Sequence, residues 1–412
     1  MKYGCIGEKL PHSFSKEIHA RLASKEYDLR ELKPDEVGAF LQEKDFCGIN
    51  VTIPYKQAVI PYLDEIDEVA REIGAVNTIV NRNGRLCGYN TDFGGMRAMI
   101  LREGIDLNEK KVLVLGTGGT SKTACVVARS LGAREILTVS RTEKAGTVTY
   151  EEVYRSHTDA EILINTTPCG MYPHVEGAPI ELEHFSSLCG VVDAVYNPLR
   201  TNLVLWAQAR GIPATGGLYM LVAQAVLAAT HFTGVAYGEE TMERIYREIF
   251  SGKENIVLIG MPACGKSTVG AILAEQTGGR LIDSDSVIVE KSGMPIPEIF
   301  AQYGEPHFRT LEREAIAELS AANSCVLATG GGAVLDAQNV HALKRNGKLY
   351  FLDRPLAELI PTDDRPLAST VEAIKKRYEE RYDIYVAAAD EIVKTLGDPT
   401  LTAQEIQRRH RS

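Results

Sequence analysis

The chain has 412 residues, enough for roughly two or three domains with sizeable cores. Its net charge of −10 and pI of about 5.5 argue against nucleic-acid binding by bulk electrostatics. Hydrophobic residues make up 44% and charged residues 24%, a composition typical of a globular protein rather than of a disordered or membrane-spanning one.

The eight cysteines are scattered without a C-x-x-C pair, so we predict neither a zinc site nor a disulfide framework. Reduced thiols fit a cytoplasmic protein best. The first residues lack the apolar core of a signal peptide, and no run approaches the ~18 apolar residues of a membrane span. We therefore expect a cytoplasmic protein that acts on small molecules, with no nucleic-acid or membrane partner and with a homo-oligomer as one option.

Residues 1–95 alternate short strands and helices, which indicates a mixed α/β layer. Strands are expected at residues 3–6 and 48–53, and helices at residues 15–24 and 65–73. Asn83-Gly84 separates the runs 75–80 and 85–89, and Asn-Gly between two such runs is a strong hairpin signal.

Polar side chains gather near the ends of these strands, where α/β proteins usually place their sites. Lys56 and Asp92 form a possible pair of the kind that can hold a proton and relay it to a carbonyl oxygen. The hydroxyls and amides around them suit an uncharged ring with several hydroxyl groups. A simpler interpretation stays open, with Asp92 as a helix cap and Lys56 as a solvated surface lysine. The other polar residues are Ser13, Ser15, Asn50, Thr52, Asn77, Asn90 and Thr91.

A second layer begins at Lys111. The apolar run 112–115 leads into Gly116-Thr117-Gly118-Gly119-Thr120-Ser121 and then into a helix that ends near Leu131. This is a Rossmann-type turn in which Ser121 takes the place of the third glycine. Further strands are expected at residues 135–139, 162–165 and 191–195.

The end of the strand at residues 135–139 lacks the acid that a NAD site would use for the ribose hydroxyls. It carries Ser140, Arg141 and Thr142 instead, with Lys144 close by. An arginine here suits a 2′-phosphate, so NADP is favoured over NAD. The alternative is a solvated arginine at a strand end.

Two helical patterns, at residues 218–230 and 239–250, are expected to return to the first layer and close a cleft between the layers. Residues 251–254 are polar and contain a glycine, so we predict a short linker there.

Residues 256–259 form an apolar strand that runs into Gly260-Met261-Pro262-Ala263-Cys264-Gly265-Lys266-Ser267. This run fits G-x-x-x-x-G-K-[ST], the phosphate-binding loop. Backbone N–H groups of Gly260 and Gly265 and the following helix, which includes Thr268, would cradle phosphate oxygens. Lys266 would reach the β- and γ-phosphates, and Ser267 would bind Mg²⁺.

Further polar groups follow this loop. Asp283 and Asp285 come after a strand, so Asp283 could orient Mg²⁺ through water while Asp285 takes a proton from a substrate hydroxyl. The alternative is a helix-start cluster. Three glycines, residues 330–332, follow another strand and permit close approach of a ligand. Arg309 and Arg381 lie in helical segments, and Arg365 lies in an irregular stretch of the kind that forms a lid.

The first ~250 residues resemble the shikimate dehydrogenases. The matching blocks are spread along this whole region, and their number makes the resemblance specific. The blocks are residues 12–15 (HSFS), 50–56 (NVTIPYK), 74–78 (GAVNT), 90–92 (NTD), 165–171 (NTTPCGM) and 217–225 (GLYMLVAQA). Two departures are Lys16, where the family usually has proline, and a short segment between Thr142 and Ile162.

This resemblance implies a role for each matching position. Lys56 and Asp92 would be the catalytic pair. Ser13 and Ser15 would hold the substrate carboxylate. The ring hydroxyls would be contacted by Thr52, Asn77 and Gln224, with Tyr196 also reaching the substrate. NADP(H) would be held by Gly116, Gly118, Gly119, Ser140, Arg141, Thr142, Lys144 and Gly217.

Residues 254–412 resemble the shikimate kinases, through the phosphate-binding loop and five later blocks. By this resemblance Arg309, Gly331, Gly332 and Arg381 hold shikimate, and Asp285 binds its reacting hydroxyl. Lys266 and Arg365 would stabilise the phosphoryl group in transfer, with Ser267 and Asp283 at Mg²⁺. One departure is Glu358, where the family usually has a basic residue near the adenine.

We therefore expect an α/β chain with a two-layer dehydrogenase followed by a parallel-sheet P-loop kinase. The expected domains are residues 1–95 with about 218–250 for substrate, 96–217 for NADP, a linker at 251–254, and 255–412 for the kinase. The function implied is NADPH-dependent reduction of 3-dehydroshikimate and MgATP-dependent phosphorylation of shikimate. One alternative is a quinate-type dehydrogenase fused to another small-metabolite kinase, and a second is a regulatory protein with decayed sites.

Overall fold

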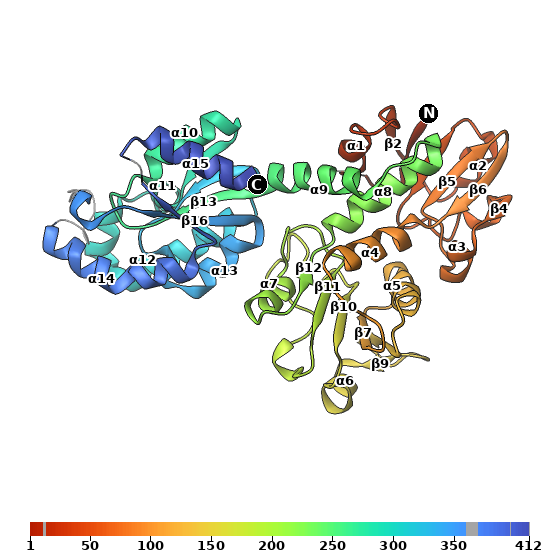
Figure 1. Cartoon of the computed structure of the whole chain (residues 1–412), viewed down its shortest axis with the longest axis horizontal. Coiled ribbons are helices and arrows are strands. Elements are labelled where there is room, and N and C mark those ends of the chain that lie inside the picture. Colours follow the sequence, from red (N-terminus) through yellow and green to blue (C-terminus); the bar gives the residue numbers. More distant parts are fainter. Residues whose placement is uncertain (11–13, 360–369, 396, 412) are drawn as a thin grey trace. The chain divides into compact units, whose positions relative to one another are not determined.

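The computed structural model describes residues 1–10, 14–359, 370–395 and 397–411. It divides into two compact units, Met1–Glu248 and Ile249–Ser412. Each unit is built from β-sheets with helices packed on them (Figure 1). The α/β class expected from the sequence is confirmed.

The first sheet of unit 1 has six strands in the order β2-β1-β3-β5-β6-β4. The strands are β1 (Tyr3–Gly7), β2 (Tyr27–Glu31), β3 (Gly48–Val51), β4 (Glu65–Ile66), β5 (Thr78–Arg82) and β6 (Arg85–Tyr89). β5 pairs antiparallel with both β3 and β6. The turn between β5 and β6 has positive φ at both Asn83 (53°) and Gly84 (86°), as the expected Asn-Gly hairpin requires.

Two helices of this layer differ from the sequence prediction. α1 (Phe14–His19) is shorter than the helix expected at residues 15–24. α3 (Glu68–Ile73) starts late because Glu65–Ile66 pairs with β6 and because the Asp67 side chain caps the helix, accepting the N–H of Ala70 at 2.7 Å. α2 (Val37–Glu43) packs its apolar face on the hydrophobic core of the first sheet.

The second sheet is all parallel, with the order β12-β11-β10-β7-β8-β9. This is the 3-2-1-4-5-6 arrangement of a Rossmann fold, read from β9 to β12. The strands are β7 (Lys111–Leu115), β8 (Glu135–Ser140), β9 (Val148–Thr149), β10 (Ile162–Asn165), β11 (Gly190–Asp193) and β12 (Ala214–Thr215). Its helices are α5 (Gly119–Ser130), α6 (Tyr150–Ser156) and α7 (Asn202–Ala209). The short segment after Thr142 leaves β9 only two residues long.

Two long helices join the layers of unit 1. α4 (Thr91–Arg102) and α8 (Leu218–Thr233) touch through Gly95, where a Cβ atom would lie 2.6 Å from the carbonyl oxygen of Met220. α8 then packs Ala228 and Phe232 against the first sheet, as the sequence predicted.

α9 (Glu239–Lys253) runs through residues 251–253, where a polar linker was expected. The helical hydrogen-bond pattern continues to Glu254, whose N–H donates to the carbonyl of Phe250 at 2.8 Å. Gly252 therefore does not interrupt the helix, and β13 begins two residues after α9 ends.

Unit 2 is a five-stranded parallel sheet in the order β14-β15-β13-β16-β17. The strands are β13 (Asn255–Ile259), β14 (Arg280–Asp283), β15 (Cys325–Ala328), β16 (Gly347–Asp353) and β17 (Glu391–Lys394). The helices are α10 (Lys266–Thr277), α11 (Ser284–Ser292), α12 (Ile296–Leu319), α13 (Ala337–Asn346), α14 (Val371–Ala388) and α15 (Pro399–Arg411). All five residues of β13 are buried, which makes this strand the centre of the core.

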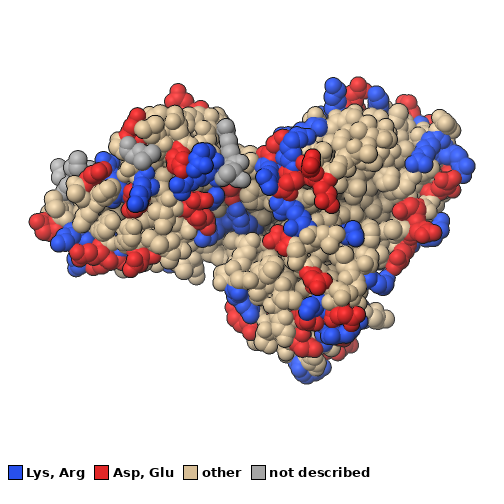
Figure 2. Space-filling model, in the orientation of Figure 1, with Lys and Arg blue, Asp and Glu red and all other residues tan. Residues whose placement is uncertain are grey.

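Among the described residues, no helix combines the length and the apolar composition that crossing a membrane requires. Lysine and arginine side chains are interspersed with acidic ones over the face drawn in Figure 2. All eight cysteines are free thiols.

A buried carboxylate at the end of β11 braces the second sheet. Asp193 accepts hydrogen bonds from the Asn165 side chain (2.9 Å), the Val195 N–H (3.0 Å) and the Thr201 hydroxyl (2.7 Å). Burial nevertheless raises the pKa of Asp193 to about 7, with the three hydrogen bonds opposing the rise.

This shift predicts a pH-dependent stability that Asp193→Asn removes. The folded state keeps the Asp193 proton up to a pH near 7, whereas the unfolded chain loses it near 3.8. The wild-type contribution to stability therefore falls as the pH rises between those values. We expect the free energy of unfolding of the variant, relative to wild type, to increase from pH 5 to pH 8 in urea denaturation. Parallel pH profiles for the two proteins would contradict this assignment.

Candidate active sites

A cavity of about 510 Å³ in unit 1 brings together the substrate-side residues that the sequence singled out. They come from both layers, because β3, α1 and α4 contribute from one side and the ends of β10 and β11 from the other. The predicted residues on its wall are Ser15, Thr52, Lys56, Asn77, Asp92, Tyr196, Gly217 and Gln224. Ser13 lies outside the described residues.

Lys56 and Asp92 meet as an ion pair in this cavity, with 2.6 Å between Nζ and Oδ2. Both side chains are partly buried, at 27% and 17% exposure. The helix-cap alternative for Asp92 does not hold, because Asn90 is the N-cap of α4 and its side chain accepts the N–H of Phe93 at 3.3 Å. Lys56 is likewise not a solvated surface lysine.

A hydrogen-bonded network of uncharged groups holds the cavity floor. Asn77 accepts the N–H of Thr91 at 2.7 Å, and the Thr91 hydroxyl lies 3.5 Å from Oε1 of Gln224. Behind them, the Asn50 side chain accepts the Tyr27 hydroxyl at 2.8 Å. Tyr27 was not singled out in the sequence, because a tyrosine inside a strand gives no signal that its hydroxyl faces a site. The network fixes the amide orientations that a polar ring would meet.

The β7–α5 turn has the open backbone that a dinucleotide phosphate needs. Gly116 has φ 109°, a conformation that favours glycine, and a Cβ there would lie 2.9 Å from Oγ1 of Thr166. Gly118 is the N-cap of α5, and a Cβ at Gly118 or Gly119 would meet no atom within 4 Å. The free space and the helix N-terminus fit the pyrophosphate of NADP.

The end of β8 lies beside this turn. Ser140 is buried and its hydroxyl accepts the N–H of Thr142 at 3.3 Å. Arg141 is exposed, and Lys144 donates to the Thr117 hydroxyl at 3.2 Å, which ties the two loops together. Arg141 and Lys144 thus place two cations near the end of β8, and Ser140, Arg141 and Thr142 include no acid, an arrangement suited to a 2′-phosphate.

Gly217 closes the cofactor side of the cavity. It is the N-cap of α8, and a Cβ there would lie 2.2 Å from the carbonyl oxygen of Ala194. The start of α8 and the end of β11 therefore touch backbone to backbone.

The phosphate-binding loop of unit 2 has the conformation that its sequence predicts. Gly260 (φ 146°), Ala263 (φ 66°) and Gly265 (φ 99°) have positive φ, which turns successive backbone N–H groups inward. Lys266 is buried and its ammonium donates to the carbonyls of Gly260 (2.8 Å) and Met261 (3.0 Å). Thr268 is exposed on the first turn of α10.

Ser267 and Asp283 meet where the sequence placed Mg²⁺. The Ser267 hydroxyl donates to Oδ2 of Asp283 at 3.1 Å, and the other carboxylate oxygen caps α11 by accepting the N–H groups of Asp285 and Ser286. The two interpretations of this cluster are therefore compatible. A hydroxyl and a carboxylate beside a phosphate-binding loop are the ligand types that Mg²⁺ takes, so the residues present fit this ion.

The loop of three glycines gathers the remaining kinase residues. Arg381 donates to the carbonyl of Gly331 at 3.1 Å, and the Tyr385 hydroxyl donates to the same carbonyl. A Cβ at Gly332 would lie 2.2 Å from the Arg309 guanidinium. Asp285 lies at the same loop, since a Cβ at Gly330 would be 2.5 Å from its Oδ1. Arg365 lies outside the described residues.

Glu312 is a buried carboxylate that the sequence analysis missed. It is 1% exposed, pairs with Arg309 at 2.7 Å, and its Oε1 would lie 3.0 Å from a Cβ at Gly330. Burial raises the pKa of Glu312, and the Arg309 guanidinium opposes the rise. The sequence did contain one indication of this pair. Glu312 stands three positions after Arg309, and residues at that spacing lie on the same face of a helix.

These geometries define two enzyme classes in one chain, a nicotinamide-nucleotide-dependent dehydrogenase and a P-loop phosphotransferase. Comparisons with known proteins identify the families. The shikimate dehydrogenase substrate binding domain matches residues 5–79, and the shikimate kinase family matches residues 262–410.

The relatives cover the dehydrogenase unit nearly end to end. Shikimate dehydrogenase (NADP(+)) of Geobacillus kaustophilus is 42% identical over 254 residues, which are 56% of this chain and 92% of that protein. A chorismate mutase/shikimate 5-dehydrogenase fusion from Clostridium acetobutylicum is 32% identical, with a TM-score of 0.57 over 60% of this chain and 96% of that one. Shikimate 5-dehydrogenase from Thermus thermophilus, solved with NADP(H) and shikimate, is 29% identical, with a TM-score of 0.54 over 60% of this chain and 99% of that one.

The chain belongs to the shikimate dehydrogenase family and carries a shikimate kinase domain after it.

The cations near the β7–α5 turn generate a prediction about cofactor choice. Arg141→Ala removes a charge-assisted contact to a 2′-phosphate, so KM for NADPH should rise about tenfold or more while turnover with NADH changes little. Steady-state kinetics with both cofactors measure this, with Arg155→Ala, an exposed arginine of α6, as the control. Equal use of NADH and NADPH by the wild-type enzyme would count against the role of Arg141.

Proposed function

We propose that the chain catalyses two consecutive reactions, each in one unit. The first unit reduces 3-dehydroshikimate to shikimate with NADPH, and the second phosphorylates the 3-hydroxyl of shikimate with MgATP. The observation that supports this proposal is that each unit brings predicted site residues together: Lys56 and Asp92 in the first, and Asp285 with the Gly330–Gly332 loop in the second. We further propose that the enzyme works in the cytoplasm.

In the first unit, the Lys56–Asp92 pair handles the proton of the reaction. NADPH, when bound, supplies the hydride to the carbonyl carbon. The carbonyl oxygen gains negative charge as the hydride arrives, and the Lys56 ammonium donates a proton to it. Asp92 holds the Lys56 side chain in position through an ion pair at 2.6 Å. Thr52, Asn77 and Gln224 hold the ring hydroxyls, and Ser15, with Ser13, holds the carboxylate.

In the second unit, the oxygen of the substrate hydroxyl attacks the γ-phosphorus of ATP, and Asp285 takes the proton from that hydroxyl. The bond from that phosphorus to the β,γ-bridging oxygen breaks, and ADP leaves. Lys266, with Arg365, offsets the charge on the phosphoryl oxygens, and Ser267 and Asp283 would hold Mg²⁺. Arg309 and Arg381 bind the shikimate carboxylate, which suits the planar fork of a guanidinium.

A quinate-type dehydrogenase joined to another small-metabolite kinase is the competing assignment. Two features favour shikimate: the cationic end of β8, and the two arginines at the Gly331–Gly332 loop in the second unit. A coupled assay with 3-dehydroshikimate, NADPH and MgATP, read for NADPH loss and ADP formation, tests the pair of reactions directly. Loss of NADPH without ADP formation would refute the kinase half.

The first catalytic assignment predicts that Lys56→Ala lowers dehydrogenase kcat by about 10²–10⁴, because proton delivery is lost. Binding of NADPH and the kinase activity of the same protein should be retained. Lys25→Ala, at an exposed lysine of the same unit, is the matched control. If purified Lys56→Ala reduces its substrate like wild type, the pair is not catalytic.

The second assignment predicts that Asp285→Asn abolishes most shikimate phosphorylation, since an amide of the same size cannot accept the proton. ATP binding through residues 260–267 and the dehydrogenase activity should persist. Glu290→Gln on the exposed side of α11 serves as the control. Substantial kinase turnover in Asp285→Asn would reduce this residue to a structural role at the start of α11.

A further inference from the structure

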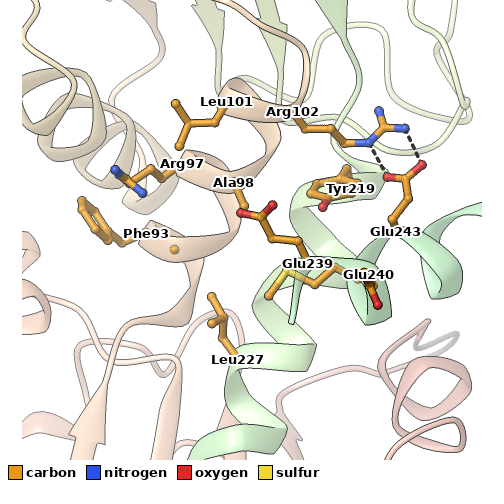
Figure 3. Close-up of a pocket in the computed structure, with 12 residues that line it drawn as sticks. Phe93, Arg97, Ala98, Leu101, Arg102, Tyr219, Leu227, Glu239, Glu240 and Glu243 are labelled. Carbon is orange, nitrogen blue, oxygen red and sulfur yellow. Dashed lines mark hydrogen bonds and ion pairs between the residues drawn. The ribbon is translucent and has the colours of Figure 1, made fainter. Parts of the chain in front are cut away.

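A second cavity of unit 1, about 740 Å³ in volume, lies between α4, α8 and the first turns of α9. It shares no wall residue with the catalytic cavity. Figure 3 shows Phe93 and Arg97 of α4 on one side, Glu239 and Glu240 of α9 on the other, and Leu227 of α8 below them. The volume is in the range of small-molecule sites.

The wall is mainly apolar. Phe93, Leu101 and Leu227 form part of it, and Tyr219 and Met242 are its deeply buried members, at 4% and 7% exposure. A ligand with an apolar body would therefore gain free energy by burying that body against this wall.

Two charged side chains on the wall already bind each other and other protein groups. The Arg102 guanidinium makes two contacts to Glu243, at 2.7 and 3.0 Å, and lies 4.9 Å from the Tyr219 ring centre and 4.5 Å from that of Tyr246. Glu243 also accepts Nε of Arg247 at 2.6 Å. These hydrogen bonds lower the pKa of Glu243 to about 2, so this carboxylate stays ionised and occupied.

The other three charged side chains on the wall have no such protein partners. Within the described parts of the chain, the side chains of Arg97, Glu239 and Glu240 make no ion pair or hydrogen bond to protein. A cation on α4 therefore faces two anions on α9 across an apolar floor (Figure 3). The complementary ligand has a carboxylate for Arg97, an ammonium group for the glutamates, and an apolar body between Phe93 and Leu227.

We propose that this cavity binds a free α-amino acid with an aromatic or large aliphatic side chain. Its position gives the binding a consequence. Phe93 follows Asp92 directly, and Tyr219 precedes Met220, a wall residue of the catalytic cavity. α4 and α8 touch at Gly95 without room for a Cβ, so a ligand seated against both helices acts on the contact that positions Asp92 and Gln224.

This regulatory consequence rests on the proposed dehydrogenase function, whereas the binding itself does not. If the ligand alters the affinity for shikimate, shikimate alters the affinity for the ligand by the same factor. Both effects are measurable on the same protein.

The test is isothermal titration calorimetry of the full chain with L-phenylalanine and L-leucine. We expect saturable binding of one molecule per chain. Arg97→Gln and the double variant Glu239→Gln/Glu240→Gln should each weaken it about tenfold or more. All three residues are exposed, so the variants keep the fold. Arg155→Gln and Glu290→Gln, exposed charges elsewhere in the chain, should bind like wild type.

Two analogues test the charge complementarity on the wild-type protein alone. 3-Phenylpropanoate lacks the ammonium group and 2-phenylethylamine lacks the carboxylate, so each should bind at least tenfold more weakly than L-phenylalanine. Absence of saturable binding, unchanged affinity in the variants, or an analogue that binds as well as the amino acid would overturn the proposal. Calorimetry needs no turnover, so these outcomes are independent of the dehydrogenase and kinase assays.

Discussion

Backbone contacts too close for any side chain hold the elements of both sites together. At Gly95 the two long helices of unit 1 touch, and at Gly217 the start of α8 touches the end of β11. At Gly331 a Cβ would lie 2.9 Å from the Pro262 ring of the phosphate-binding loop and 3.3 Å from its backbone nitrogen. Because neither backbone nor a proline ring bonded to it can move aside as a flexible side chain can, each contact fixes the distance between two site-bearing elements.

Parallel sheets supply the second constraint. The carboxyl ends of β7 and β8 meet at one edge, and those of β13, β14 and β15 meet at another. The parallel arrangement alone therefore brings together residues far apart in sequence, such as Asp283 and the Gly330 loop. Ser284, which follows Asp283, even accepts the N–H of Gly330 at 2.9 Å.

Strand ends and glycine turns were predictable from the sequence because they depend on local patterns. The Asn83-Gly84 hairpin, the phosphate-binding loop and the Rossmann turn all follow from residues adjacent in the chain. The start of α3 was not predictable in the same way, because it depends on a pairing with β6 that is distant in sequence.

The same distinction separates the site residues. Lys56 and Asp92 were proposed as a pair from the chemistry of their types, and the structure brings them within 2.6 Å of each other. Glu312 and Tyr27 were not predicted because their importance lies in what surrounds them, a partly buried arginine in one case and a buried amide in the other. The continuation of α9 through Gly252 was also missed, since one glycine weakens a helix without necessarily ending it.

The two units differ in how they balance charge around the same proposed ligand. Lys56 supplies the basic side chain and Asp92 the acidic one on the wall of the dehydrogenase cavity, and the other proposed substrate contacts there are hydroxyls and amides. A carboxylate held by neutral donors leaves the Lys56 ammonium as the strongest positive field at the reacting oxygen.

In the function that we propose, the kinase site binds the same carboxylate with arginines, and acidic side chains keep these arginines in place. Arg309 lies between Glu305 (2.8 Å) and Glu312 (2.7 Å), so its charge is largely balanced before any ligand arrives. Glu312 also faces Asp285 across Gly330. Two carboxylates this close favour the uptake of a proton by the pair. In the mechanism that we propose, the acid that positions Arg309 therefore also favours proton transfer from the substrate hydroxyl to Asp285. Substrate binding and base catalysis would then depend on one cluster of residues.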